Sequence, residues 1–242
     1  MNKFLCVFAI LVLLSSCQIT ENLTINENGS GSFEMTEIRH EPSYMQLVGE
    51  QYSKEDFYKD STYVFEDYIK KYNSNFIKYT PAEQALFSMY KEVRVHLKKS
   101  SFDKEYKTTF TYLFDTVANI PDLYKTEDYA DDLENNYALT AEKHYYSVRY
   151  SYDNLKFKRI VTITNLEEQN KQKAEMDSTK SKYGKLGLIQ TYQLNYNFPR
   201  KIKSVSNNSA TISADKKSMT ISFPLNECIA NPAITQLEVV LE

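Results

Sequence analysis

The chain contains no tryptophan and only five glycines, six prolines and three cysteines among its 242 residues. So little glycine and proline excludes a collagen-like or low-complexity chain. The charged fraction of 25% and the aromatic fraction of 14% are typical of a folded domain and exclude an intrinsically disordered one. A net charge of -3 gives no electrostatic reason to expect nucleic acid as a partner. The length predicts one large soluble domain or two small ones.

Long apolar runs are also absent, because no stretch reaches the roughly 20 residues that a membrane-spanning helix needs. The run Phe4–Leu14 has eleven residues, follows Lys3, and has the length of the apolar region of a secretory signal. It ends in Leu14-Ser15-Ser16-Cys17, which resembles the lipobox of bacterial lipoproteins. The resemblance implies cleavage between Ser16 and Cys17, diacylglycerol on the Cys17 thiol, and a further acyl chain such as palmitate on its amine. The alternative is a buried strand or helix that merely ends in cysteine.

The predicted organisation is a lipoprotein signal peptide at 1–16 and a single α+β envelope domain at 17–242, lipid-anchored at Cys17. More than one acyl chain on one residue holds a protein stably in a membrane. The residue after the cysteine is Gln18 and not an acidic residue. By the rule known for other Gram-negative bacteria, this predicts sorting to the outer membrane. Cys228 would then be the one remaining thiol, so no internal disulfide is expected. Among apolar neighbours it is most simply a small buried hydrophobe, with a reactive thiol as the alternative.

Local patterns predict both strands and helices in the first half. Alternating residues on either side of a Gly/Asn-rich stretch predict a β-hairpin over 23–36. Thr80, Pro81 and Glu83 predict the capped start of a helix. Its expected apolar stripe consists of Ala82, Ala85, Leu86, Met89, Tyr90 and Val93. Residues 42–79 fit both helical spacing and strand alternation, and both alternatives stay open.

The remaining patterns set the fold class. Residues 165–182 are almost wholly polar, which indicates a solvated helix capped by Asn165 or a mobile arm. An acidic, partly exposed helix is expected within 122–139. Alternation predicts strands near 93–97, 110–114, 147–152, 155–164, 192–198, 210–214, 219–223 and 237–241. Since no regular βαβ rhythm occurs, we predict an α+β fold: a mostly antiparallel sheet with an N-terminal β-hairpin, a helical middle and a β-rich C-terminal third.

No motif of catalysis occurs in the chain: the nucleophile elbow, the Walker A loop and the dinucleotide fingerprint are all missing. His40, His96 and His144 are far apart in sequence, and the mature chain lacks the thiols of a CxxC site, so neither a metal nor another cofactor is expected. The adjacent pairs Asp131-Asp132 and Glu167-Glu168 lie in polar runs and are expected to face water. We therefore expect that the protein is not an enzyme.

Two features favour binding instead. Twenty tyrosines give many amphipathic rings, and exposed ones could contact sugars or lipid headgroups, although ordinary sheet packing is the alternative. Arg200, Lys201 and Lys203 form a basic cluster after Pro199. This cluster could meet anionic headgroups near the anchor, the alternative being a solvated strand end.

Two segments carry a resemblance to known proteins. The first runs from Cys17-Gln18-Ile19-Thr20-Glu21-Asn22 into Asn28-Gly29-Ser30-Gly31-Ser32-Phe33, and the second is Phe198-Pro199-Arg200-Lys201-Ile202-Lys203-Ser204-Val205. They resemble the two ends of uncharacterised Bacteroidota lipoproteins and are loosely similar to the LppM-like lipoprotein module of mycobacteria. That family implies an α+β envelope domain that interacts with glycolipid. The resemblance covers both ends of the chain and carries over no functional residue.

The sequence thus predicts a bacterial membrane-anchored lipoprotein that acts as a non-catalytic binding or structural module of the cell envelope. Its expected partners are the membrane, through lipid on Cys17, and a glycolipid or an envelope protein. Two alternatives stay open: a periplasmic enzyme, in which buried histidine or carboxylates would converge in a cleft, and a surface-exposed adhesin. A filled core would favour a scaffold, whereas a lipid-sized pocket would favour glycolipid binding.

Overall fold

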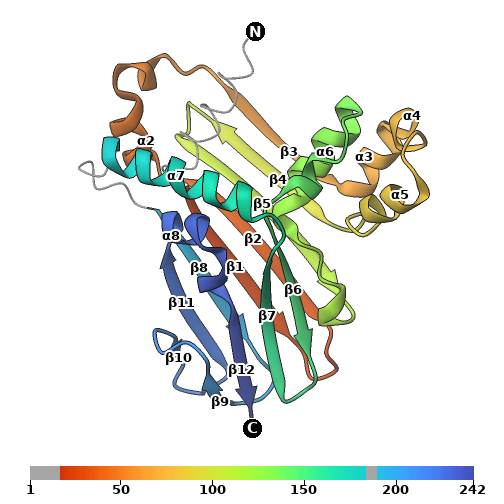
Figure 1. Ribbon diagram of the computed structural model, residues 1–242, viewed down its shortest axis with the longest axis vertical. Helices are drawn as coiled ribbons and strands as arrows, with labels where there is room; N and C mark the ends of the chain where they lie inside the picture. The colour runs from red at the N-terminus through yellow and green to blue at the C-terminus, as the bar shows by residue number, and fades with distance from the viewer. Residues whose placement is uncertain (1–16, 184–189) are drawn as a thin grey trace.

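The computed structural model describes residues 17–183 and 190–242, so the predicted signal peptide lies outside the described residues. Two β-sheets run through this part, and helices gather at one end of it (Figure 1). The larger sheet has eight strands in the order β10-β11-β8-β1-β2-β5-β4-β3, and the smaller has four in the order β6-β7-β12-β9. All pairings are antiparallel except that of β1 with β8. The predicted α+β class is confirmed.

The elements have the following bounds. The larger sheet contains β1 Cys17–Ile25, β2 Gly31–Arg39, β3 Tyr58–Val64, β4 Arg94–Ser100, β5 Glu105–Phe114, β8 Thr191–Asn197, β10 Thr211–Ile212 and β11 Ser218–Pro224. The smaller sheet contains β6 Tyr146–Tyr152, β7 Lys156–Ile163, β9 Ile202–Val205 and β12 Leu237–Leu241. The α-helices are α2 Glu41–Val48, α3 Phe65–Lys71, α4 Asn73–Phe76, α5 Pro81–Ser88, α6 Thr126–Asn135, α7 Leu166–Tyr183 and α8 Leu225–Ala230.

The N-terminal hairpin is confirmed as the pair β1 and β2. The Asn26 amide donates to the Ser30 carbonyl at 2.8 Å, which closes the turn. Gly29 has φ +84°, a left-handed conformation that glycine adopts without steric cost. A Cβ atom on Gly31 would lie 1.9 Å from the Thr24 carbonyl oxygen, so only glycine fits at this first position of β2 after the turn. The two glycines therefore serve the turn.

Helix α5 begins where the sequence predicts but ends earlier. The Thr80 hydroxyl accepts from the Glu83 amide at 3.3 Å, and the Glu83 carboxylate accepts from the Thr80 amide at 2.8 Å, which completes the capping box. The helix stops at Ser88, so the predicted apolar stripe does not continue along it. Met89 is 56% exposed, and Phe87, which lies outside the predicted stripe, is fully buried. The contact of Phe87 with Tyr129 of α6, and not helical spacing alone, decides which face is buried.

Several other predictions are settled at the level of elements. Residues 42–79 contain both alternatives, because β3 leads directly into α3 at Phe65. The strands predicted near 93–97 and 110–114 are longer than expected, because β4 and β5 extend toward each other and leave a turn at 101–104. Residues 165–182 form a helix, α7, and the Asn165 side chain accepts from the Glu168 amide at 3.1 Å as its cap. The helix α8 and the strand β9 were not predicted.

The two sheets pack face to face around an aromatic core. Phe33 of the larger sheet lies 5.3 Å from Tyr150 of the smaller one, measured between ring centroids, and Tyr196 lies 5.4 Å from Phe157. Leu23 is among the side chains buried completely between them. Burial of this kind is the main favourable contribution to folding. No helix within 17–183 and 190–242 is long and apolar enough to cross a membrane.

Candidate ligand-binding site

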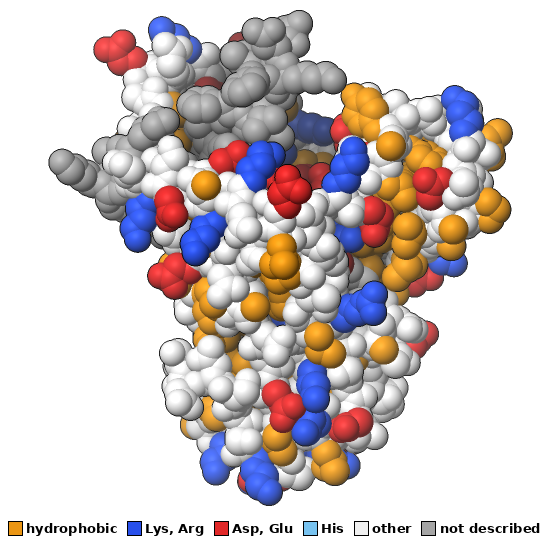
Figure 2. All heavy atoms as spheres, viewed as in Figure 1, with side chains coloured by type: hydrophobic (Ala, Val, Ile, Leu, Met, Phe, Trp, Pro, Cys, Tyr) orange, Lys and Arg blue, Asp and Glu red, His pale blue; other side chains and the backbone are white. Residues whose placement is uncertain are grey.

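A cavity of about 660 Å³ lies where α7 and α8 cover the ends of the two sheets. Its wall comes from α7, α8, the segment 140–146, and the first residues of β1 together with the last of β2. Figure 2 shows the surface hollowed beside α7, with acidic and basic side chains gathered around the hollow. Ile19 of β1 and its cross-strand neighbour Glu37 of β2 both line the cavity, which places it at the Cys17 end of the strands.

A buried ion pair lies under the cavity. Glu21 of β1 and Arg159 of β7 are 0% and 1% exposed, and the Arg159 Nη2 atom lies 3.0 Å from the Glu21 Oε1 atom. The Arg159 Nη1 atom also donates to the Thr235 hydroxyl at 2.6 Å and to its carbonyl at 3.3 Å. The Nη2 atom additionally donates to the Tyr192 hydroxyl at 2.7 Å, and the Nε atom donates to Glu21 Oε2 at 3.3 Å. Each nitrogen of the guanidinium therefore makes a hydrogen bond. Arg159 therefore joins the two sheets.

Tyrosine hydroxyls complete this cluster. Tyr196 donates to Glu21 Oε2 at 2.5 Å, Tyr150 donates to the same oxygen at 3.4 Å, and Tyr192 donates to Oε1. Burial alone would raise the pKa of Glu21, but Arg159 and the hydroxyls hold that pKa below its ordinary value. The carboxylate is therefore charged, and the pair is a fixed, fully hydrogen-bonded floor.

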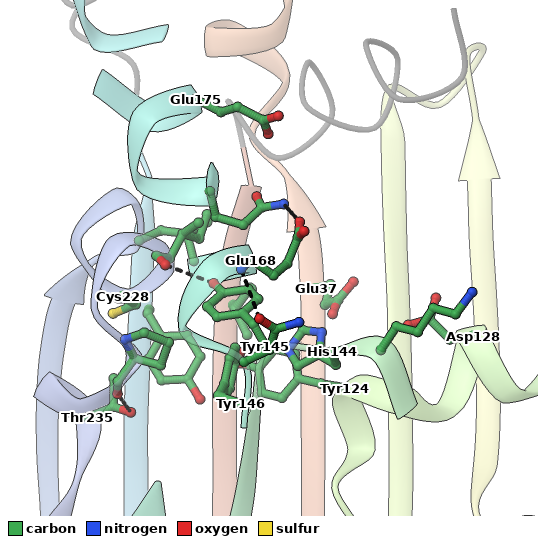
Figure 3. A pocket seen from close by; sticks show the side chains of 18 of the residues that line it. Glu37, Tyr124, Asp128, His144, Tyr145, Tyr146, Glu168, Glu175, Cys228 and Thr235 are labelled. Carbon is green, nitrogen blue, oxygen red and sulfur yellow. Dashed lines mark hydrogen bonds between the residues drawn. The ribbon is translucent and has the colours of Figure 1, made fainter. Parts of the chain in front are cut away.

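An aromatic wall stands above this floor (Figure 3). The Tyr146 ring lies 4.4 Å from His144, 5.0 Å from Tyr145 and 6.4 Å from Tyr124, between centroids. The Tyr145 hydroxyl donates to the Ile229 carbonyl of α8 at 2.8 Å and is thereby held in place. The Tyr124 hydroxyl and His144 Nε2 are buried but make no hydrogen bond to any described residue. Buried polar atoms without partners are uncommon, and both of these lie within the packed wall and not on its exposed surface.

His144 is neutral at physiological pH. Burial lowers its pKa to about 4, and the positive charge of Lys125 acts in the same direction. The ring therefore offers one donor and one acceptor, and it adds no positive charge to the wall.

Carboxylates surround the upper part of the cavity. Glu37, Asp128, Glu168 and Glu175 line it, and Figure 3 shows Glu37 and Glu168 above the aromatic wall. Burial and the negative charge of Glu127 raise the pKa of Glu37 to about 7. The Glu168 carboxylate accepts from Gln172 at 2.9 Å, and this bond is the main cause of its lowered pKa.

Cys228 of α8 also lines the cavity and is buried, as predicted. Burial raises the pKa of its thiol to about 12, so the thiol is protonated at neutral pH. A protonated thiol is a poor nucleophile, which favours a packing role over a reactive one.

The structure separates the other predicted site residues from one another. Cys17 is the first residue of β1, its side chain is not described, and Ser16 lies outside the described residues. Arg200, Lys201 and Lys203 are exposed and follow the far end of β8, where Asn197 pairs with Thr24. Seven residues of strand separate that end from Cys17, a distance of about 23 Å. The cluster therefore lies at the opposite end of β1 from Cys17, and its contact with headgroups stays a prediction.

The buried ion pair is not among the predictions from the sequence, although the sequence contains a signal for it. Glu21 stands between Ile19 and Leu23 in the inward phase of β1, and Arg159 stands between Phe157 and Val161 in β7. A charged residue in the apolar phase of a strand must find a partner if that face is buried. His96, in contrast, is exposed and lies 3.0 Å from Asp60. No group of three metal-ligating side chains occurs among the residues that the structure describes.

Neither a protein-family model nor a curated protein matches the chain. Among solved structures, the chain is similar to the folded domain of LppM from Mycobacterium tuberculosis, with a TM-score of 0.41 and 8% identity. The match covers 94% of this chain and 90% of that one. A TM-score of this size does not establish a common fold and says nothing about activity. The LppM-like resemblance thus has a weak structural counterpart, and the resemblance to Bacteroidota lipoproteins stays a prediction.

Proposed function

We propose that residues 17–242 form a non-catalytic binding module of the bacterial cell envelope, anchored by lipid on Cys17, that holds an amphipathic ligand such as a lipid or glycolipid. The observation that supports this is the cavity. Its volume of about 660 Å³ lies within the range of small-molecule sites, which are mostly apolar with a few polar groups. The aromatic wall supplies the apolar surface, and lining carboxylates such as Glu37 and Glu168 supply polar contacts.

The position of the cavity supports the link between ligand and membrane. Strand β1 begins at Cys17 itself, so the described chain has no linker between that residue and the fold. Ile19, two residues along β1, already lines the cavity. Two strand residues span about 7 Å, so an anchored Cys17 would hold the cavity close to the lipid surface.

Retention of a ligand tests the proposal. The lipidated protein, purified in a non-ionic detergent, should yield a bound amphiphile on denaturation and mass spectrometry. Replacement of Cys228 by Phe places a ring in the α8 side of the cavity and should reduce the bound amount at least about fivefold, whereas Cys228→Ser keeps the volume and should retain it. Equal retention by the two variants, with circular dichroism unchanged, would reject the cavity as the binding site.

Membrane anchoring is tested separately. Cys17→Ser removes the residue that receives lipid, so the variant should leave the membrane fraction and take up no radiolabelled palmitate. Cys6→Ser, within the predicted signal peptide, is the matched control and should remain lipidated. A Cys17→Ser protein that stays in the membrane fraction would contradict the anchor.

A second candidate, an enzyme, is favoured by one observation: Glu37, with a pKa of about 7, shares the cavity with His144. A carboxyl group with such a pKa can act as a general acid or base near neutral pH. Glu37→Gln discriminates between the two candidates. An enzyme would accumulate an unreacted compound in the variant, whereas a binding module holds the same compound in both proteins.

A further inference from the structure

We propose that the ligand of this cavity carries an ammonium group, which the carboxylates and the tyrosine rings recognise together, and that it is a lipid of the membrane that holds Cys17. The inference rests on the proposed function and specifies the class of its ligand. Three features carry it: the imbalance of charge around the cavity, the aromatic wall, and the placement at the Cys17 end of β1.

The charges that line the cavity are unbalanced. Four carboxylates line it, on β2, α6 and α7, namely Glu37, Asp128, Glu168 and Glu175. The lining cations within the described ranges are Lys143 and Arg159. The Arg159 charge is already matched by buried Glu21 at 3.0 Å, so it does not offset the carboxylates. Glu37, with a pKa of about 7, carries only part of its charge at neutral pH. The other three carboxylates still favour a cation over a molecule whose only charge is negative.

Neighbouring cations offset this excess only in part. Lys171 lies 3.4 Å from Glu168 and pairs with it, Lys99 acts on Glu37, and Lys125 donates to Glu142 at 2.9 Å. Glu127 and Asp132 of α6 add further negative charge close to Glu37 and Asp128. The local field on the α6 side is therefore acidic beyond the lining residues themselves.

The aromatic wall fits the same ligand. Tyr124 and Tyr146 stand 6.4 Å apart with their rings inclined at 60°, next to His144 and Tyr145. Ammonium groups are attracted to tyrosine faces by about 0.5–2 kcal/mol, and clusters of such faces recognise alkylated ammonium ligands. Neutral His144 does not oppose this attraction, because it carries no charge at pH 7.

The position of the cavity near Cys17 indicates that its ligand comes from the membrane. Ile19 and Glu37 lie opposite each other two residues from Cys17, so an anchored chain brings the cavity to the headgroup layer. A zwitterionic lipid would place its ammonium group among the carboxylates and rings. Its phosphate would then meet Lys143, which is exposed at the edge of the cavity.

The experiment offers two lipids at equal concentration, dioleoyl phosphatidylethanolamine and dioleoyl phosphatidylglycerol, to the full lipidated protein. Native mass spectrometry from a non-ionic detergent counts each lipid bound, after subtraction of the Cys228→Phe background. We expect the ammonium lipid to be preferred about tenfold, which corresponds to about 1.4 kcal/mol. Equal binding, or a preference for phosphatidylglycerol, overturns the inference and leaves the proposed function standing. Binding of neither lipid above the background overturns both.

Substitutions test which residues cause the preference for the ammonium lipid. Glu37→Gln combined with Asp128→Asn should reduce it to about twofold or less. Glu27→Gln, an exposed change in the hairpin turn, should preserve it. Tyr146→Leu should lower it whereas Tyr146→Phe, which keeps the ring, should not. A preference unchanged in the double variant overturns the inference.

A separate experiment tests whether the ligand is a membrane lipid or a soluble ammonium compound. Soluble phosphoethanolamine, added at the same concentration as the lipid, should displace little of it, because the apolar wall contributes most of the contact area. Displacement by half or more would keep the ammonium chemistry but overturn the membrane as its source.

Discussion

At the scale of single residues, the ion pair of Glu21 and Arg159 is fully buried, so the loss of one partner should be costly. Breaking a buried pair leaves an uncompensated charge, which costs about 3–5 kcal/mol. We therefore expect Arg159→Met to lower the free energy of unfolding in urea by that amount. The Glu21→Met/Arg159→Met double variant should recover much of the loss, since neither charge is then left alone.

An exposed pair on the same protein provides the contrast. Lys70 and Glu66 of α3 lie 3.1 Å apart with side chains 65% and 52% exposed. Lys70→Met should change the free energy of unfolding by less than about 0.5 kcal/mol. If Arg159→Met has an effect as small as this, burial of the Glu21 pair has no energetic consequence and the argument above is wrong.

Glu37 gives the protein a specific dependence on pH. Its pKa is about 7 when folded and 4.5 ordinarily, so the folded state binds the proton more tightly. Its contribution to stability is full below pH 4.5 and is lost as the pH rises through 7. A shift of this size corresponds to about 3 kcal/mol for a dry site, which partial exposure reduces to about 1–2 kcal/mol.

Glu37→Gln should accordingly raise the free energy of unfolding by about 1–2 kcal/mol at pH 8 and have little effect at pH 5. Urea titrations at the two pH values check this, with the exposed Glu27→Gln as a control of equal charge change. A stabilisation equal at both pH values would show that Glu37 does not titrate in this window.

At the scale of elements, α7 should be the least stable part of the site. It rests on α8 with few apolar contacts, Leu166 at its start is 68% exposed, and the Gln169 side chain reaches the Ala230 carbonyl only at 3.4 Å. Segments with little burial open at low free energy. Hydrogen exchange should therefore replace the amides of α7 at least about tenfold faster than those of β1, and ligand should slow α7 most. Equal protection of α7 and β1 in the free protein would contradict this.

Elements whose signals are local could be predicted from the sequence, whereas the site could not. The turn at Gly29 and the cap at Thr80 depend on neighbours within a few residues, so the sequence pattern identifies both. The burial of Phe87 depends on Tyr129 of α6, 5.3 Å away between ring centroids, and no spacing within α5 reveals that contact.

The cavity depends still more on distant segments. Ile19, Tyr146, Glu168 and Cys228 line it together although they are far apart in the chain. The sequence gives only local information about two of them: Cys228 has apolar neighbours, and Glu168 belongs to a polar run. The fold alone shows that both line the same cavity. Glu21, beneath the cavity, differs from them because its inward phase in β1 can be read from the sequence.

At the scale of the whole molecule, β1 runs from Cys17, the proposed site of lipid, past the cavity to the hairpin turn. Because β1 is a central strand of the larger sheet, Cys17 marks one end of that sheet and the turn at Asn26–Ser30 marks the other. The helices α7 and α8 cover the Cys17 end. A lipid on Cys17 would thus set the orientation of the domain and present the cavity, not the basic cluster at Arg200, to the membrane.

This orientation can be measured with fluorophores on the lipidated protein in vesicles. In a Cys228→Ala background, labels at Lys173→Cys on α7 and at Glu27→Cys in the hairpin turn report the two ends of the sheet. A quencher in the lipid phase should quench the α7 label strongly and the turn label weakly, since β1 alone separates its ends by about 26 Å. The same labels on Cys17→Ser protein should both be unaffected. Equal quenching at the two positions would show that the domain lies flat, and the cavity would then have no preferred access to the lipid.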